Sequence, residues 1–189
     1  DFMPSLKTAL CPYFEAASDC AKNLMRGFAL SLNLDPKFFL KTSNLPISRG
    51  SSLFYPPQPP GLGYDQLGVG PHTDYGCLTL LYQDQTGGLE IRDCNSEWVL
   101  APPIQDTLVV NVGDLLARWT NDRFGSTKHR VVNRSCSARQ SLALFYDPNF
   151  ETIVDPKEIF GQKNSHYESS ITCGDYIISR LNSSFSYRR

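Results

Sequence analysis

The sequence has almost no net charge and no long apolar run, and each absence excludes a class of protein. Eighteen Lys and Arg stand against 19 Asp and Glu, which leaves a formal net charge of -1. Such a chain has no basic field for nucleic acid. The sequence contains no run of 18 apolar residues, which is the length needed to span a bilayer. It also lacks the charged and then apolar N-terminal stretch that is typical of a signal peptide. We therefore expect a cytoplasmic protein that binds neither nucleic acid nor membranes.

The six cysteines form no Cys-x-x-Cys pair, which argues against a zinc ribbon or finger. The chain has 189 residues, of which 41% are hydrophobic. That is the size of one domain, and its core is large enough to fold without disulfide bonds. We expect reduced thiols and a monomer. The chain begins at Asp1, so we also expect either a trimmed sequence or the C-terminal part of a longer one.

An N-terminal helical segment is predicted over residues 1–50. Apolar residues recur there at the spacing of one helix face, namely Ala17, Ala21, Leu24, Phe28 and Leu32. Pro12 suits a first helical turn. Asp35 and Pro36 end the pattern, and residues 36–40 can form a second, short helix. This segment is expected to pack on the core.

Residues 51–155 read as a β-rich core, so the fold class is mainly β with flanking helices. Short β-rich runs alternate there with turn residues, as in an antiparallel sandwich or barrel. The predicted strands are 53–55, 77–82, 88–92, 98–101, 107–112, 129–133 and 141–146. Residues 107–112 are almost continuously apolar, which predicts burial on both faces. Residues 56–70 are rich in Pro and Gly and predict a long loop at the mouth.

A C-terminal helical segment is predicted over residues 156–189. Its apolar residues share one helix face, namely Gly174, Ile177, Ile178, Leu181 and Phe185. We expect this helix to cover the outside of the sheet.

Only three histidines are present, and two of them lie in patterns that suit a metal ion. His72 and Asp74 are two positions apart, so on an extended strand they project to the same side. His129 opens a later apolar run. Two imidazoles and one carboxylate can form a face that leaves positions open on Fe(II). The alternatives are a solvated His-Asp pair and a His129 that bonds to backbone at the core edge. His166 lies in a polar stretch and receives no role.

Arg139 and Ser141 form a third pattern, ten residues beyond His129. A guanidinium and a hydroxyl on one strand face can hold a carboxylate. Alone, the pattern would be interpreted as an ordinary surface arginine.

Together, the order and spacing of these patterns resemble the Fe(II)/2-oxoglutarate-dependent dioxygenases, in the isopenicillin N synthase-like branch. The surrounding sequence is similar too, over residues 71–81, 87–91 with Trp98, 110–114, 119–123 and the pair Tyr55-Pro56. The resemblance runs from about Ser51 to Pro148. It implies a double-stranded β-helix, or jelly roll.

The resemblance also implies the site residues and the chemistry. The iron ligands would be His72, Asp74 and His129. The cosubstrate 2-oxoglutarate would be held by Arg139, Ser141 and Tyr55, and a small-molecule substrate would meet Phe145, Asp147 and Asn111. With O2, such enzymes hydroxylate or desaturate a small organic substrate and release succinate and CO2. A carboxylate at position 74 argues against halogenation.

Two features depart from the family pattern, and other functions stay open. Leu53 stands where plant members often carry Asn, and family members usually have a longer N-terminal region. The chain is therefore expected to be a fragment or a natural short form. The alternatives are an Fe(II) oxidase that does not use 2-oxoglutarate, a non-catalytic jelly-roll binding module, and a zinc hydrolase. The sequence does not specify the substrate.

Overall fold

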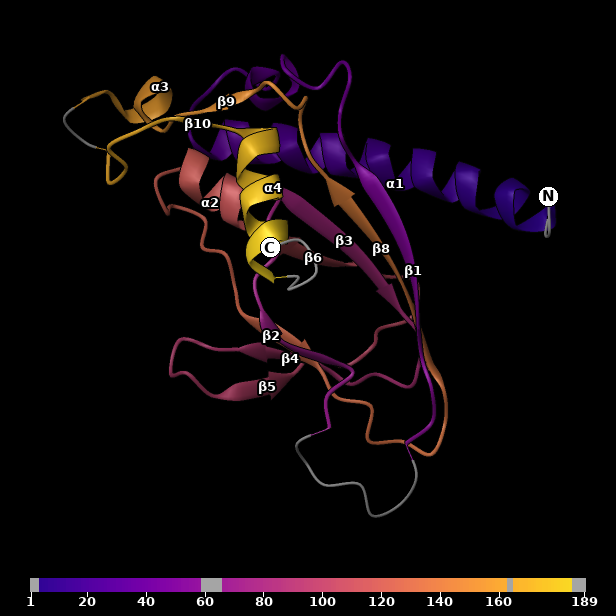
Figure 1. The fold of residues 1–189 in the computed structure, drawn as a ribbon. Helices are drawn as coiled ribbons and strands as arrows, with labels where there is room; N and C mark the ends of the chain where they lie inside the picture. The colour runs from indigo at the N-terminus through magenta and orange to yellow at the C-terminus, as the bar shows by residue number, and fades with distance from the viewer. Residues whose placement is uncertain (1–3, 59–65, 163–164, 185–189) are drawn as a thin grey trace.

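Two four-stranded antiparallel sheets face each other in the computed structural model, which describes residues 4–58, 66–162 and 165–184 (Figure 1). The first sheet has the order β1-β8-β3-β6, with β1 Arg49–Tyr55, β8 Arg139–Tyr146, β3 Leu78–Gln83 and β6 Val109–Val112. The second has the order β2-β7-β4-β5, with β2 Val69–His72, β7 His129–Val131, β4 Leu89–Arg92 and β5 Trp98–Leu100. This arrangement is the predicted jelly roll.

Helices and a small two-stranded sheet surround the two large sheets. The helices are α1 Pro4–Ser31, the 3-10 turn η1 Phe38–Leu40, α2 Asp114–Trp119, α3 Lys157–Phe160 and α4 Cys173–Ser184. The small sheet pairs β9 Ile153–Val154 with β10 Ile171–Thr172. The short helix predicted over residues 36–40 is therefore present as the single 3-10 turn η1. No helix in the described ranges is long and apolar enough to cross a membrane.

Helix α1 covers the outer face of the first sheet. Its buried residues Ala17, Ala21, Met25 and Ala29 recur every fourth position and pack in one core cluster with Leu78, Leu80, Leu144 and Tyr146. Small alanines allow the helix to approach the sheet closely. The predicted helix face is confirmed, but the expected start is wrong. Pro12 lies inside the helix, which begins at Pro4 and so continues through the position where proline removes one backbone hydrogen bond.

Strand β6 differs from its prediction in both length and burial. It begins at Val109 rather than Thr107, and the Val110 side chain is 43% exposed. The reason is its place in the sheet, because β6 pairs only with β3 and forms an edge. The expectation of burial on both faces is therefore wrong.

The C-terminal helix lies elsewhere than expected. Figure 1 shows α4 beside α2, with its C-terminal end directed toward the second sheet, while α1 runs along the first sheet. Ile177 and Leu181 of α4 line the same cavity as His72 and Asp74. The fifth residue of the predicted face, Phe185, lies outside the described residues. The reason for the difference is that the outer face of the first sheet is already occupied by α1.

The predicted loop over residues 56–70 is only partly described, since residues 59–65 lie outside the described ranges. Its last two positions, Val69 and Gly70, already belong to β2. All six cysteines are free thiols, with Cys77 and Cys173 buried.

Candidate metal centre

The three predicted metal ligands meet at one end of the second sheet. His72 ends β2 and is the cross-strand partner of His129, which begins β7. Asp74 follows β2 by two residues. Its Oδ1 lies 3.9 Å from His72 Nε2 and 3.7 Å from His129 Nε2. Metal–ligand bonds are about 2 Å long, so two atoms on one ion lie at most about 4 Å apart. Both distances to Asp74 meet this limit, and the ligand atoms of all three side chains lie within 4.8 Å of one another, so the group could hold one ion.

Backbone carbonyls orient both imidazole rings. His72 Nδ1 lies 2.8 Å from the Gly70 carbonyl oxygen, and His129 Nδ1 lies 3.1 Å from that of Thr127. Each Nδ1–H donates to its carbonyl, which leaves the Nε2 lone pair directed at the carboxylate side. Burial lowers the pKa of His72, which favours the neutral ring that can ligate a metal.

Asp74 is held from behind by Asn111. The carboxylate is only 6% exposed, and Asn111 Nδ2 donates to its Oδ2 at 2.6 Å. That bond leaves Oδ1 free to face the two histidines. Two neutral imidazoles, one supported carboxylate and no thiolate form a donor set that suits Fe(II). The residues present therefore fit the metal that the sequence resemblance implies.

Arg139 is fully buried, and its hydrogen-bond partners are neutral groups. Its Nε donates to the Gly87 carbonyl at 2.6 Å, one terminal nitrogen to Ser141 Oγ at 3.2 Å and the other to Gln83 Oε1 at 3.4 Å. Its guanidinium carbon lies 4.7 Å from the ring centroid of Tyr55. No carboxylate in the described part of the chain lies within 4.0 Å of it.

Burying the charge of Arg139 without a paired anion costs free energy. Burial lowers the pKa of Arg139, and the nearby Tyr55 and Asp84 offset this only in part. Buried charges are normally paired. The arrangement of Arg139, Ser141 and Tyr55 therefore fits a ligand carboxylate, as the resemblance implies for 2-oxoglutarate.

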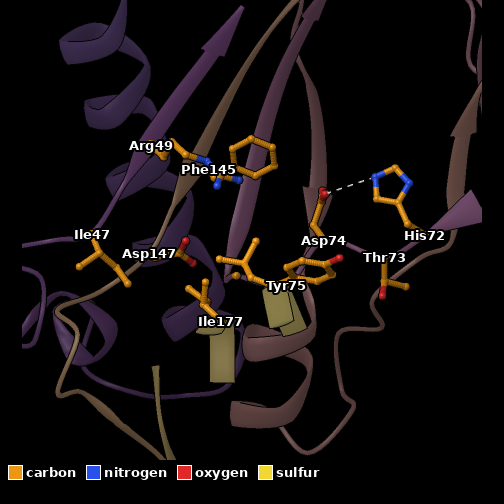
Figure 2. A pocket seen from close by; sticks show the side chains of 11 residues that line it. Ile47, Arg49, His72, Thr73, Asp74, Tyr75, Phe145, Asp147 and Ile177 are labelled. Atoms are coloured by element: carbon orange, nitrogen blue, oxygen red, sulfur yellow. Dashed lines mark ion pairs between the residues drawn. The ribbon is translucent and has the colours of Figure 1, made fainter. Parts of the chain in front are cut away.

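A cavity of about 270 Å³ opens on one side of the metal ligands (Figure 2). Its lining comes from four parts of the chain: Ile47 and Arg49, then residues 72–76, then Phe145 and Asp147, and finally Ile177 and Leu181 of α4. The predicted substrate residues Phe145 and Asp147 therefore do reach the space beside His72 and Asp74. Burial raises the pKa of Asp147 to about 6.

A second cavity of about 210 Å³ adjoins the first. Asp74 lines both cavities, whereas Asn111 and His129 line only the second. The candidate metal centre thus lies between two separate spaces. Asn111, predicted as a substrate residue, lies behind the carboxylate ligand and away from Phe145 and Asp147.

The sequence analysis missed the cavity residues Arg49, Ile47, Ile177 and Leu181. A signal for Arg49 was available, because it lies six residues before Tyr55 in the same strand and alternate strand residues share a face. Ile177 and Leu181 were correctly predicted to share one helix face. That face was expected to cover the outside of the sheet, but it lines the cavity.

Known proteins share these features. A family model described as the 2OG-Fe(II) oxygenase superfamily matches residues 47–148. The 2-oxoglutarate-Fe(II) type oxidoreductase ppzC of Metarhizium rileyi is 34% identical over 97% of this chain and 51% of its own. The homoarginine-6-hydroxylase 2-ODD-C23 of Glycine max is 37% identical over 81% of this chain and 48% of its own. The chain thus spans about half the length of these curated relatives.

Solved structures agree with the sequence relatives. A full-length Neurospora crassa protein, solved in complex with alpha-KG, superposes with a TM-score of 0.88 at 32% identity, over 96% of this chain and 58% of that one. The same protein has also been solved with alpha-KG and thymine. The matching family model covers the segments that bring His72, Asp74 and His129 together, and it also covers Arg139. The chain therefore belongs to the 2OG-Fe(II) oxygenase superfamily.

Proposed function

We propose that the protein is an Fe(II)- and 2-oxoglutarate-dependent oxygenase that oxidises a small organic substrate. The observations that carry this function are the fully buried Arg139, which has no carboxylate within 4.0 Å in the described residues, and the His-Asp-His group in the same fold. Family membership supports the same conclusion. A non-catalytic binding module would need neither the three metal ligands nor the carboxylate-binding pair Arg139 and Ser141. A zinc hydrolase would need the metal ligands but would leave Arg139 and Ser141 without a role.

Each residue has a defined part in this function. His72, Asp74 and His129 would hold the iron, and Asn111 keeps the Asp74 carboxylate turned toward it. Arg139 and Ser141 would bind the distal carboxylate of 2-oxoglutarate, with Tyr55 stacked on the guanidinium. Bound iron and 2-oxoglutarate supply the oxidation, in which O2 and the oxo acid yield succinate, CO2 and oxidised substrate.

The apolar residues around Arg139 exclude water. Tyr55, Leu89 and Val131 form a buried cluster between the sheets, with Leu53 and Leu81 packed against it. Low polarity strengthens the pairing of Arg139 with a carboxylate. The chain therefore contributes position and shielding, and the cosubstrate contributes the oxidant.

A small-molecule substrate would occupy the cavity beside His72, against Phe145 and Asp147. Two proteins similar to this chain suggest its size, since one is named a homoarginine-6-hydroxylase and the other has been solved with thymine. The oxidation would be hydroxylation or desaturation. Three expectations stay predictions: the division of the chain at residues 50 and 155, the cytoplasmic location and the monomeric state.

Anaerobic titration tests this function without knowledge of the substrate. Protein loaded with Fe(II) is titrated with 2-oxoglutarate while the weak visible charge-transfer band of the chelate is followed. We expect a saturable band that Arg139→Ala removes and that the exposed-residue control Arg92→Ala retains. Bound iron with no band would favour an oxidase that does not use 2-oxoglutarate. A protein that binds no iron at all would favour the non-catalytic module.

A further inference from the structure

The cavity beside His72 contains two side chains of opposite charge that the metal and the cosubstrate do not use. Arg49 comes from β1, and Asp147 directly follows β8, the strand with which β1 pairs. Figure 2 shows both on the side of the cavity away from His72, with Phe145 next to Arg49. Each has unused binding capacity.

The Arg49 guanidinium is exposed to the cavity and forms no close ion pair, although its charge acts on Asp147 from a longer distance. Its carbon lies 4.6 Å from the ring centroid of Phe145, its cross-strand partner in the register of β1 and β8. Within the described ranges, no carboxylate oxygen lies within 4.0 Å of it. Stacking on Phe145 holds the planar group in place while its N–H donors stay available.

Asp147 is only 5% exposed, and just one of its two carboxylate oxygens is bonded. The Cys77 backbone N–H donates to Oδ1 at 2.7 Å. Oδ2 has no hydrogen-bond partner among the residues that the structure describes. Oδ2 is open to the cavity, so it takes a donor from water or from a ligand. Because Asp147 lines the cavity, that donor can come from a molecule bound there.

The remaining walls limit what such a molecule can be. Ile47, Phe145, Ile177 and Leu181 present apolar surface, and the volume is about 270 Å³. The occupant is therefore small and has an apolar carbon skeleton. The two charges lie on neighbouring strands, so its own charged groups must be close enough to reach both.

Building on the proposed oxygenase function, we propose that the substrate is a small zwitterion of the amino-acid class. Its carboxylate binds Arg49, and a cationic nitrogen donates to Asp147 Oδ2. The two contacts fix the carbon skeleton against Phe145, with one carbon directed toward the His72–Asp74 side of the cavity. A molecule that lacks either charge leaves one buried or stacked group unmatched, and this mismatch provides the selectivity.

Calorimetric titration of the Fe(II)- and 2-oxoglutarate-loaded protein without O2 tests this assignment, because Arg139 is then already occupied. The probes are L-arginine and L-lysine. Agmatine and cadaverine are their counterparts without a carboxylate, and pentanoate and hexanoate are carboxylates without nitrogen. We expect at least one amino acid to bind tenfold or more tightly than both of its counterparts.

Two variants assign the contacts. Arg49→Gln should remove the preference over the amine, and Asp147→Asn should remove the preference over the carboxylate while keeping the acceptor for Cys77. The matched controls are Arg92→Gln and Asp106→Asn, both exposed and outside the cavity. Both should retain the preferences of the unmodified protein.

The outcomes separate this inference from the proposed function. A normal charge-transfer band together with equal binding of the amino acids and their counterparts would overturn the zwitterion assignment alone. Charge-selective binding that survives both variants would overturn the roles of Arg49 and Asp147. A missing band before any probe is added would contradict the oxygenase function itself.

Discussion

Tyr55 and Arg139 are cross-strand partners in β1 and β8, and the Arg139 guanidinium carbon lies 4.7 Å from the Tyr55 ring centroid. The ring covers one face of a buried cation that has only neutral hydrogen-bond partners. The pair therefore presents a flat, fixed donor group between the two sheets. Its orientation is set by strand register before any ligand binds.

Arg139→Lys should weaken 2-oxoglutarate binding while Fe(II) binding persists. Lysine keeps the charge but cannot reproduce the forked donors. Losing a charge-assisted hydrogen bond costs about 1.5–3 kcal/mol, or about ten- to a hundredfold in affinity. Tyr55→Leu should have a smaller effect, since a cation–π contact contributes about 0.5–2 kcal/mol. Titration of the charge-transfer band measures both, and an unchanged affinity in Arg139→Lys would remove Arg139 from the cosubstrate site.

His129→Ala should abolish specific Fe(II) binding, because two side chains hold an ion poorly. The loss should exceed the tenfold to about hundredfold that removal of a supporting group typically causes. Anaerobic Fe(II) titration measures it. The matched control is His166→Ala, whose ring is exposed and lies 3.7 Å from Asp122, and this variant should bind Fe(II) normally. Equal affinities of the two variants would contradict the ligand assignment.

Asn111→Ala should lower Fe(II) affinity by about tenfold or more, because Asp74 loses the donor that orients its carboxylate. The exposed loop variant Asn95→Ala is the control. Metal titration distinguishes this role from the substrate contact that the sequence resemblance suggests. If Asn111→Ala binds Fe(II) normally and only substrate affinity falls, Asn111 is a substrate residue.

Asp147 should make the metal-free protein less stable as pH rises from about 4 to about 6. Burial raises its pKa from 3.8 to about 6, opposed by the nearby Arg49 and assisted by Asp74. Between these values the native state holds more protons than the unfolded state, so stability falls with pH. The total loss is about 3 kcal/mol and is complete above pH 6.

Denaturant unfolding of the metal-free protein at a series of pH values measures this effect. The free-energy difference between Asp147→Asn and the unmodified protein should grow in favour of the variant from pH 4 to pH 6 and then level off. Taking the difference removes the contributions of other titrating groups. A difference that stays constant with pH would show that Asp147 ionises normally in the folded protein.

The sequence alone determined the residues that share a strand face or a helix face. Arg139 and Ser141 lie on β8, and a strand places such a pair on one side wherever it packs. The expected shared strand of His72 and Asp74 ends at His72, so their pairing rests on the family resemblance and not on strand alternation. The helix face that contains Ala17 and Ala21 follows from the same kind of periodicity. These patterns, with their resemblance to a known family, were sufficient to predict the jelly roll and the metal ligands.

Only the tertiary structure decided which of these faces meet. Asn111 supports Asp74 because β6 pairs with β3 at a particular register, and Arg49 stacks on Phe145 because β1 pairs with a strand about 90 residues away. The position of α4 at the cavity followed from α1 already covering the outer face of the sheet. Such choices depend on the packing of distant segments, and local periodicity does not record them.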